Sequence, residues 1–211
     1  MFGRKKIFII IIPVTFICFI LLAFYFQLPN KIFSGRYKIS GIDVSHHQGG
    51  IDWEDIEKQG VEFAYIKATE GSSYVDECYE SNRKKAEETG IHIGFYHFFS
   101  FESPGITQAE HYIETVGGLE GKLIPAIDVE FYGGQGNPDK ESVNKELTDM
   151  LEYLEKYYGR KPIIYSTQFF YNEYLKNGYD DYPLWIRNVY LPPAQDWTIW
   201  QYSDRLPLDG I

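Results

Sequence analysis

The sequence predicts an α/β protein with a parallel sheet, preceded by a membrane-spanning helix. Strand and helix patterns alternate along most of the 211 residues, which is typical of βαβ units. Segments such as LIPAID (123–128) and PIIYS (162–166) are almost continuously apolar, as strands covered on both faces are. A doubly wound sheet and a closed barrel both fit this alternation. No Gly-x-Gly-x-x-Gly loop follows the first strand, which disfavours the nucleotide-binding form.

The N-terminus is predicted to anchor the chain in a membrane. Residues 1–6 form a basic tail, and residues 7–26 form an uncharged, mostly apolar run. About 20 such residues span the hydrocarbon core, and the basic tail predicts that this end stays in the cytoplasm. A cleaved signal peptide usually has a shorter apolar region followed by small residues, whereas this run ends in bulky rings. We expect an uncleaved, single-pass anchor in the cell membrane, a polar linker over 27–36 and a domain over 37–211 outside the cytoplasm.

The composition argues against two classes of protein. The formal net charge is -10, whereas a nucleic-acid-binding chain needs Lys and Arg to neutralise phosphates. The two cysteines, Cys18 and Cys78, are not expected to pair, because Cys18 lies in the apolar N-terminal run. A disulfide framework is therefore not expected.

The first half of the domain predicts three strands and two helices. The first strand is expected to end at Asp43. Asp52 is an N-cap for the first helix, and Gly60 and Gly90 end the two helices. The elements in order are a strand at 37–45, a helix at 52–60, a strand at 61–71, a polar helix at 76–90 and a strand at 91–99.

The second half continues the alternation. Gly117 and Gly118 end its first helix, and Leu147, Leu151 and Leu154 are spaced for one face of a long amphipathic helix. The elements in order are a helix at 107–118, a strand at 122–130, a helix at 139–159, a strand at 161–166, a short helix at 167–175 and strands at 182–190 and 196–204.

Three carboxylates lie at predicted strand ends, where parallel architectures gather their reactive groups. They are Asp43, Asp128 and Glu130. Asp128 and Glu130 share a face if their strand continues through Glu130, and close carboxylates raise one pKa. A protonated acid beside an ionised partner is what glycosidic cleavage requires. An Asp-x-Glu triplet alone is weak, because most such triplets lie on solvated faces.

Metal binding by the acids with His46, His47 or His97 is a weaker alternative. The sequence has no His-Glu-x-x-His and no cysteine ligand pairs, so we expect no metal. His97 suits a core histidine equally well.

Aromatic side chains near the predicted strand ends are candidates for stacking on sugar rings, although each one taken singly is more often a core residue. The candidate substrate-binding residues are Tyr65, Tyr96, His97, Phe98, Tyr165, Trp185, Tyr190, Trp200 and Gln201.

Seven motifs occur in an order and spacing that resemble glycoside hydrolase family 25, the Chalaropsis-type lysozymes or N-acetylmuramidases. They are GIDVSHHQGGIDW, FAYIKATEG, GFYHFF, IPAIDVE, PIIYS, LWI and IWQYS. The resemblance runs from Ile39 to the C-terminus. It implies an irregular TIM-like (β/α) barrel that cleaves the β-1,4 bond from N-acetylmuramic acid to N-acetylglucosamine in peptidoglycan glycan strands, without a cofactor. It also implies that Glu130 is the proton donor, Asp128 its charged partner and Asp43 a supporting acid.

The chain departs from the family pattern at two places. It stops at LPLDGI, where the family usually continues into Gly-x-x-Gly-x-Val-Asp-Leu-Asn, so we expect a truncated domain that lacks its last strand and leaves an unpaired edge. Arg187 and Asn188 follow Trp-Ile where the family often has a small residue. A peptidoglycan-binding module without turnover and a chitinase-like hydrolase are the alternative functions. Nothing in the sequence indicates a protein partner.

Overall fold

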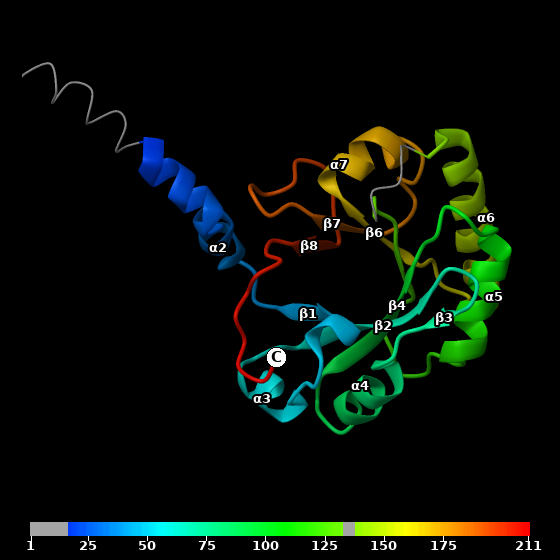
Figure 1. Ribbon diagram of the computed structural model, residues 1–211, viewed down its shortest axis with the longest axis horizontal. Helices are drawn as coiled ribbons and strands as arrows, with labels where there is room; N and C mark the ends of the chain where they lie inside the picture. Colours follow the sequence, from blue (N-terminus) through cyan, green and yellow to red (C-terminus); the bar gives the residue numbers. More distant parts are fainter. Residues whose placement is uncertain (1–16, 133–137) are drawn as a thin grey trace, which may run out of the picture.

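A single curled sheet forms the centre of the protein, in a computed structural model that describes residues 17–132 and 138–211 (Figure 1). Its main strands run parallel in the order β1-β2-β4-β5-β6-β7-β8, and β3 pairs antiparallel with β2. The bounds are β1 Gly41–Val44, β2 Phe63–Glu70, β3 Tyr74–Val75, β4 His92–Phe98, β5 Ala126–Asp128, β6 Ile163–Thr167, β7 Leu184–Arg187 and β8 Ile199–Gln201. The predicted α/β class with a parallel sheet is confirmed.

The sheet is a curled half-barrel with β1 and β8 at its two edges. No backbone pairing joins these edges within residues 17–132 and 138–211. Figure 1 shows β8 beside β1, and a side-chain hydrogen bond from Gln201 to Asp43 connects them. Strands β1 and β8, the first and last of the described residues, therefore meet at a seam that side chains hold.

Helices α3, α4, α5 and α6 lie around the outside of the sheet, whereas α2 extends away from it on the side of β1 and β8 (Figure 1). The bounds of the helical elements are α2 Leu28–Ser34, η1 His46–Gln48, α3 Trp53–Lys58, α4 Tyr79–Ala86, α5 Gly105–Val116, α6 Lys140–Tyr158, α7 Gln168–Phe170 and the π-helical turn η2 Tyr171–Leu175. Asp52 caps α3 as predicted, because its side chain accepts from the backbone N–H of Asp55. Helix α4 is shorter than the predicted range 76–90. Asp76 forms a turn with Cys78 before α4 begins, and the Thr89 hydroxyl donates to the carbonyl of Ala86 at its end.

Two apolar clusters explain the nearly continuous hydrophobicity of the strands. One side of each strand packs against the helices, as Ile66, Phe95 and Ile127 do. The other side forms a smaller cluster inside the curled sheet. Its buried members are Tyr65, Ala126, Ile163, Tyr165 and Trp185. The pocket described below lies at this inner side.

Helices α5 and α6 approach each other closely at Gly105. A Cβ atom added there would lie 1.8 Å from the carbonyl oxygen of Glu146, a backbone atom. We therefore expect Gly105→Ala to destabilise the protein by about 2–3 kcal/mol, since overpacking forces the helices apart. Urea unfolding measures this change. Gly50→Ala is the matched control, because no atom lies within 4 Å of its added Cβ; equal stability of the two variants would contradict the close approach.

The described part of the N-terminus forms two short helices rather than one long one. Residues 7–16 of the predicted membrane helix lie outside the described residues. Among those described, no single helix has the length and hydropathy of a membrane span, while Ile17–Tyr25 and Leu28–Ser34 pass that test together, with a bend of 57° between them. The bend occurs at Gln27, whose φ of 54° is left-handed. The predicted linker thus contains a helix, α2, and its contacts are described below.

Candidate active site

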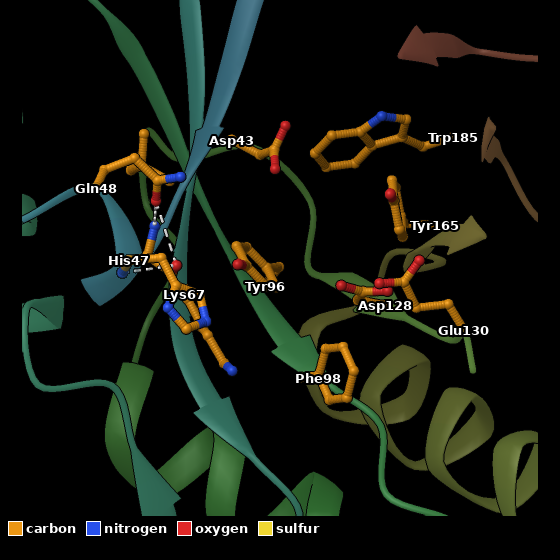
Figure 2. A pocket seen from close by; sticks show the side chains of 12 residues that line it. Asp43, His47, Gln48, Lys67, Tyr96, Phe98, Asp128, Glu130, Tyr165 and Trp185 are labelled. Atoms are coloured by element: carbon orange, nitrogen blue, oxygen red, sulfur yellow. Dashed lines mark hydrogen bonds between the residues drawn. The ribbon is translucent and has the colours of Figure 1, made fainter. Parts of the chain in front are cut away.

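Strand β5 brings Asp128 and Glu130 to the same side of the sheet. Although β5 ends at Asp128, the extended pairing continues for one more residue, because the N–H of Val129 donates to the carbonyl of Tyr165 (2.9 Å). Val129 is fully buried against the helices, so its two neighbours point the opposite way. Figure 2 shows Asp128 and Glu130 next to each other, with Asp43 facing the same space from β1.

These three acids line a pocket of about 260 Å³. The wall combines carboxylates, one lysine and several aromatic rings (Figure 2). Its residues are Asp43, Val44, Ser45, His47, Gln48, Lys67, Tyr96, Phe98, Asp128, Glu130, Tyr165 and Trp185. Rings beside carboxylates in a concave site suit a sugar, which offers both apolar faces and hydroxyl groups.

Burial and mutual repulsion favour the protonated forms of the Asp128 and Glu130 carboxyls. Burial raises the pKa of Asp128 well above its ordinary value of 3.8, and the negative charges of Glu130 and Asp43 raise it further. Burial also raises the pKa of Glu130, against the opposing positive charge of Arg187. Asp128 Oδ1 is buried without a hydrogen-bond partner among the described residues. The pair therefore retains a proton to higher pH than ordinary carboxyls do.

Gln201 of β8 holds Asp43 at the seam of the sheet. Its Nε2 donates to Asp43 Oδ1 (2.7 Å), and its Oε1 accepts from the Tyr165 hydroxyl (2.8 Å). The tyrosine hydroxyl thus orients the amide so that its NH₂ group faces the carboxylate. Burial raises the pKa of Asp43, and this hydrogen bond opposes that rise because it favours the charged form.

For the cell-wall hydrolysis that the sequence resemblance implies, we expect Gln201→Met to lower kcat/KM by at least about tenfold, since a hydrogen bond to a charged group contributes about 1.5–3 kcal/mol. Methionine keeps the length of the side chain but cannot donate to Asp43. Turbidity loss of cell-wall suspensions measures the rate. Gln195→Met is the control, because Gln195 bonds Gln168 outside the pocket; a wild-type rate for Gln201→Met would argue against this role.

The opposite wall contains residues that sequence reasoning did not assign to the site. Lys67 is buried, lies 2.6 Å from Glu70 Oε2, and its Nζ lies 4.9 Å from the centre of the Phe98 ring. Ser45 and Gln48 form a reciprocal cap on η1, which places His47 at the pocket. Lys67 could have been found from the sequence, because a lysine within the apolar strand FAYIKATEG is expected to be buried. A buried lysine is almost always paired with another group.

The structure brings only part of the predicted aromatic set to the pocket. Tyr96, Phe98, Tyr165 and Trp185 line it. Tyr65 lies in the inner apolar cluster, where its hydroxyl donates to the carbonyl of Ile124.

Three other candidates lie away from the pocket wall. His97 is fully buried, and its ring nitrogens form hydrogen bonds with Thr69 and Gln108. It is therefore a core histidine, which the sequence predicted as the alternative to a binding residue. Trp200 donates its Nε1 to the carbonyl of Asn188, and Tyr190 is 61% exposed.

No group of three or more His, Cys, Asp or Glu side chains in residues 17–132 and 138–211 is arranged to hold a metal ion. His46 instead bonds Asp76 through Nδ1 (2.6 Å).

Comparison with known proteins gives consistent matches. The profile described as glycosyl hydrolases family 25 matches residues 42–211. An uncharacterized protein, YegX, of Escherichia coli K12 is 37% identical over 201 residues, covering 89% of this chain and 73% of its own. The autolytic lysozyme of Clostridium acetobutylicum is 34% identical over 176 residues, covering 82% of this chain and 53% of its own.

A solved structure agrees with these matches. A family 25 glycosyl hydrolase from Bacillus anthracis has a TM-score of 0.80 and 48% identity, covering 83% of each chain. The pocket acids Asp43, Asp128 and Glu130 all lie within the range that the family profile matches. The chain therefore belongs to glycosyl hydrolase family 25.

Proposed function

We propose that this protein is a lysozyme, an N-acetylmuramidase that hydrolyses the β-1,4 bond between N-acetylmuramic acid and N-acetylglucosamine in peptidoglycan. The observation that carries the proposal is the buried Asp128–Glu130 pair, which faces Asp43 in a pocket lined by rings. The relatives named lysozyme and N,O-diacetylmuramidase support the same substrate class.

Each carboxyl has a role in this proposal. Glu130 donates its proton to the glycosidic oxygen as the bond to the sugar breaks. In the reactive form the proton that the pair retains lies on Glu130, so that Asp128 and Asp43 provide negative charge near the oxocarbenium-like centre that forms. Water then adds to that centre and completes the hydrolysis. Arg187 favours the charged form of Glu130 after the proton has left. Tyr165 and Trp185 form an apolar wall for a sugar ring.

The product distinguishes this function from its alternatives. A muramidase leaves muramic acid at the new reducing end, which mass spectrometry of the released fragments identifies. Release of fragments from chitin but not from peptidoglycan would support a chitinase-like hydrolase. Binding to cell walls without any release would support a binding module and would overturn the assignment.

We further propose that the curled sheet is a form of the irregular TIM-like barrel. We also propose that residues 7–26 anchor the enzyme in the cytoplasmic membrane, with the domain outside the cytoplasm. The apolar run and the basic tail support the anchor. Protease treatment of intact spheroplasts should digest the domain. In membranes that have not been treated with protease, the protein should remain in the membrane fraction after alkaline washing. Release by that washing would contradict the anchor.

A further inference from the structure

Helix α2 contacts the domain through polar side chains. Asn30 is fully buried, and Gln27 just before the helix is 4% exposed. The apolar Leu28 and Ile32 are instead exposed, at 43% and 76%. A segment that packs only to hide apolar surface would show the reverse pattern. The contact therefore depends on specific hydrogen bonds.

Asn30 connects the ends of the last two strands. Its Nδ2 donates to the carbonyl of Asn188 (2.8 Å), which follows β7, and to the carbonyl of Tyr202 (3.0 Å), which follows β8. These strands deliver Arg187 and Gln201 toward the acids. One amide group from the N-terminal segment thus fixes the separation of two strand ends that support the pocket.

Gln27 connects the same segment to Arg187. Its Nε2 donates to Asp204 Oδ1 (2.8 Å), and its Oε1 accepts from the Ser203 hydroxyl (2.6 Å). Asp204 Oδ2 in turn accepts from Arg187 Nη2. The left-handed backbone of Gln27 is unusual for a residue other than glycine, and such conformations persist where the surroundings determine them.

Arg187 is the cation through which this connection reaches the acids. Its positive charge lowers the pKa values of Asp43, Asp128 and Glu130, against the effect of burial. Tyr165 and Asp204 are the other titratable groups that face it, and Arg205 also pairs with Asp204 (3.3 Å). The position of Arg187 therefore sets part of the protonation balance in the pocket.

We propose that the N-terminal segment 27–34 is part of the active-site framework, with Gln27 and Asn30 as positioning residues that hold Arg187 and the ends of β7 and β8 at the pocket. This inference rests on the proposed muramidase function. It assigns a contribution to catalysis to a segment that the sequence predicted as a linker. Because this segment follows the proposed anchor directly, its orientation relative to the domain affects the chemistry of the pocket.

The test uses the full chain in detergent micelles with purified cell walls. Gln27→Met keeps side-chain length without hydrogen bonds, and Asn30→Asp keeps the shape but removes both donors. We expect kcat/KM to fall about fivefold in each, less than for loss of a direct hydrogen bond to a charged group. We also expect the alkaline limb of the pH profile of Gln27→Met to move up by about 0.5 pH unit, because a less fixed Arg187 lowers the pKa of Glu130 less. Lys31→Ala, an exposed change on the same helix, is the control.

A double-mutant cycle with Arg187→Gln shows whether Gln27 acts through Arg187. In the Arg187→Gln background, Gln27→Met should leave the alkaline limb unchanged, since the group that transmits its effect is gone. A shift of the same size in both backgrounds, or parent-like rates and limbs in both single variants, would overturn the inference. A fall in melting temperature without any shift of the limb would show a purely structural role and would also overturn it.

The pH dependence of thermal unfolding gives a second measurement that needs no turnover. Gln27→Met should lose more stability than the parent as the pH rises above the ordinary carboxyl values of 3.8 and 4.5, because carboxyls with higher folded-state pKa values keep their favourable protonation further and lose more stability when it is gone. If the parent releases no sugar from cell walls, the proposed function fails, while this measurement still decides the inference. Identical pH dependence in parent and variant would contradict it.

Discussion

Replacing Glu130 by glutamine should lower kcat/KM for cell-wall hydrolysis about 10³-fold, within the range that general acid catalysis contributes. Glutamine keeps the size of the side chain and its place beside Asp128, but it has no proton to give to a leaving oxygen. Turbidity loss of cell-wall suspensions, with the fragments counted by mass spectrometry, measures the fall. Binding to the walls should persist, because the rings and the other two acids remain.

The pH profile of the parent tests the same role. Glu130 must be protonated to act, so activity should fall as pH rises through its raised pKa, and a flat profile into strongly alkaline solution would contradict the assignment. Glu114→Gln removes an exposed carboxyl on α5 and is the matched control. Equal clearing by the Glu130 and Glu114 variants would remove Glu130 from the mechanism.

Asp128→Asn should have opposite effects on turnover and on stability. Turnover should fall about 10²-fold, because the site loses a negative charge that stabilises the transition state electrostatically. Stability at pH 7 should rise by about 1 kcal/mol, or about 2–4 °C in melting temperature for a chain of this size, since a buried carboxylate with an unpaired oxygen is removed. Active sites commonly retain such unfavourable groups for function.

The pH dependence of this stability gain follows from the direction of the pKa shifts. The folded state keeps protons on the pair at pH values where the unfolded chain has lost them, so stability falls as pH rises. The contribution is fully present below the ordinary values of 3.8 and 4.5 and is lost as the pH passes the raised folded-state values. Calorimetry should therefore show parent and variant converging toward pH 4. A constant difference from pH 4 to pH 8 would contradict the buried, repelling pair.

The sequence predicted the strands and the position of the acids well, because both depend on local patterns. Apolar runs that end in Asp or Glu locate a strand and its reactive end in a single stretch, as around Asp128. The link from Gln201 to Asp43 was not predictable in this way, since it joins residues 158 positions apart. The same holds for Gln27 and Asp204, whose partnership depends on where a short segment packs.

Some candidates could have been separated by alternation along a strand. Tyr96 and Phe98 both line the pocket, so His97 between them faces the helices. Trp200 and Gln201 are likewise neighbours and point in opposite directions. Tyr65 also faces the inner side of the sheet, as the alternation predicts, but it lies deeper than the pocket residues. This depth depends on the register between strands, which pairs Tyr65 with Gly94, and the sequence of one strand does not give that register.

The meeting of the first and last strands has a consequence for biosynthesis. Asp43 leaves the ribosome long before the amide that supports it, which is added 158 positions later, at Gln201. Domains generally fold as units during synthesis. A polypeptide that has not yet reached Gln201 contains all three acids but lacks the residue that completes the seam, so the domain is not yet whole. A polypeptide that terminates upstream of Gln201 should therefore leave the cell wall intact, and the chain acquires lytic capacity only after Gln201 has been translated.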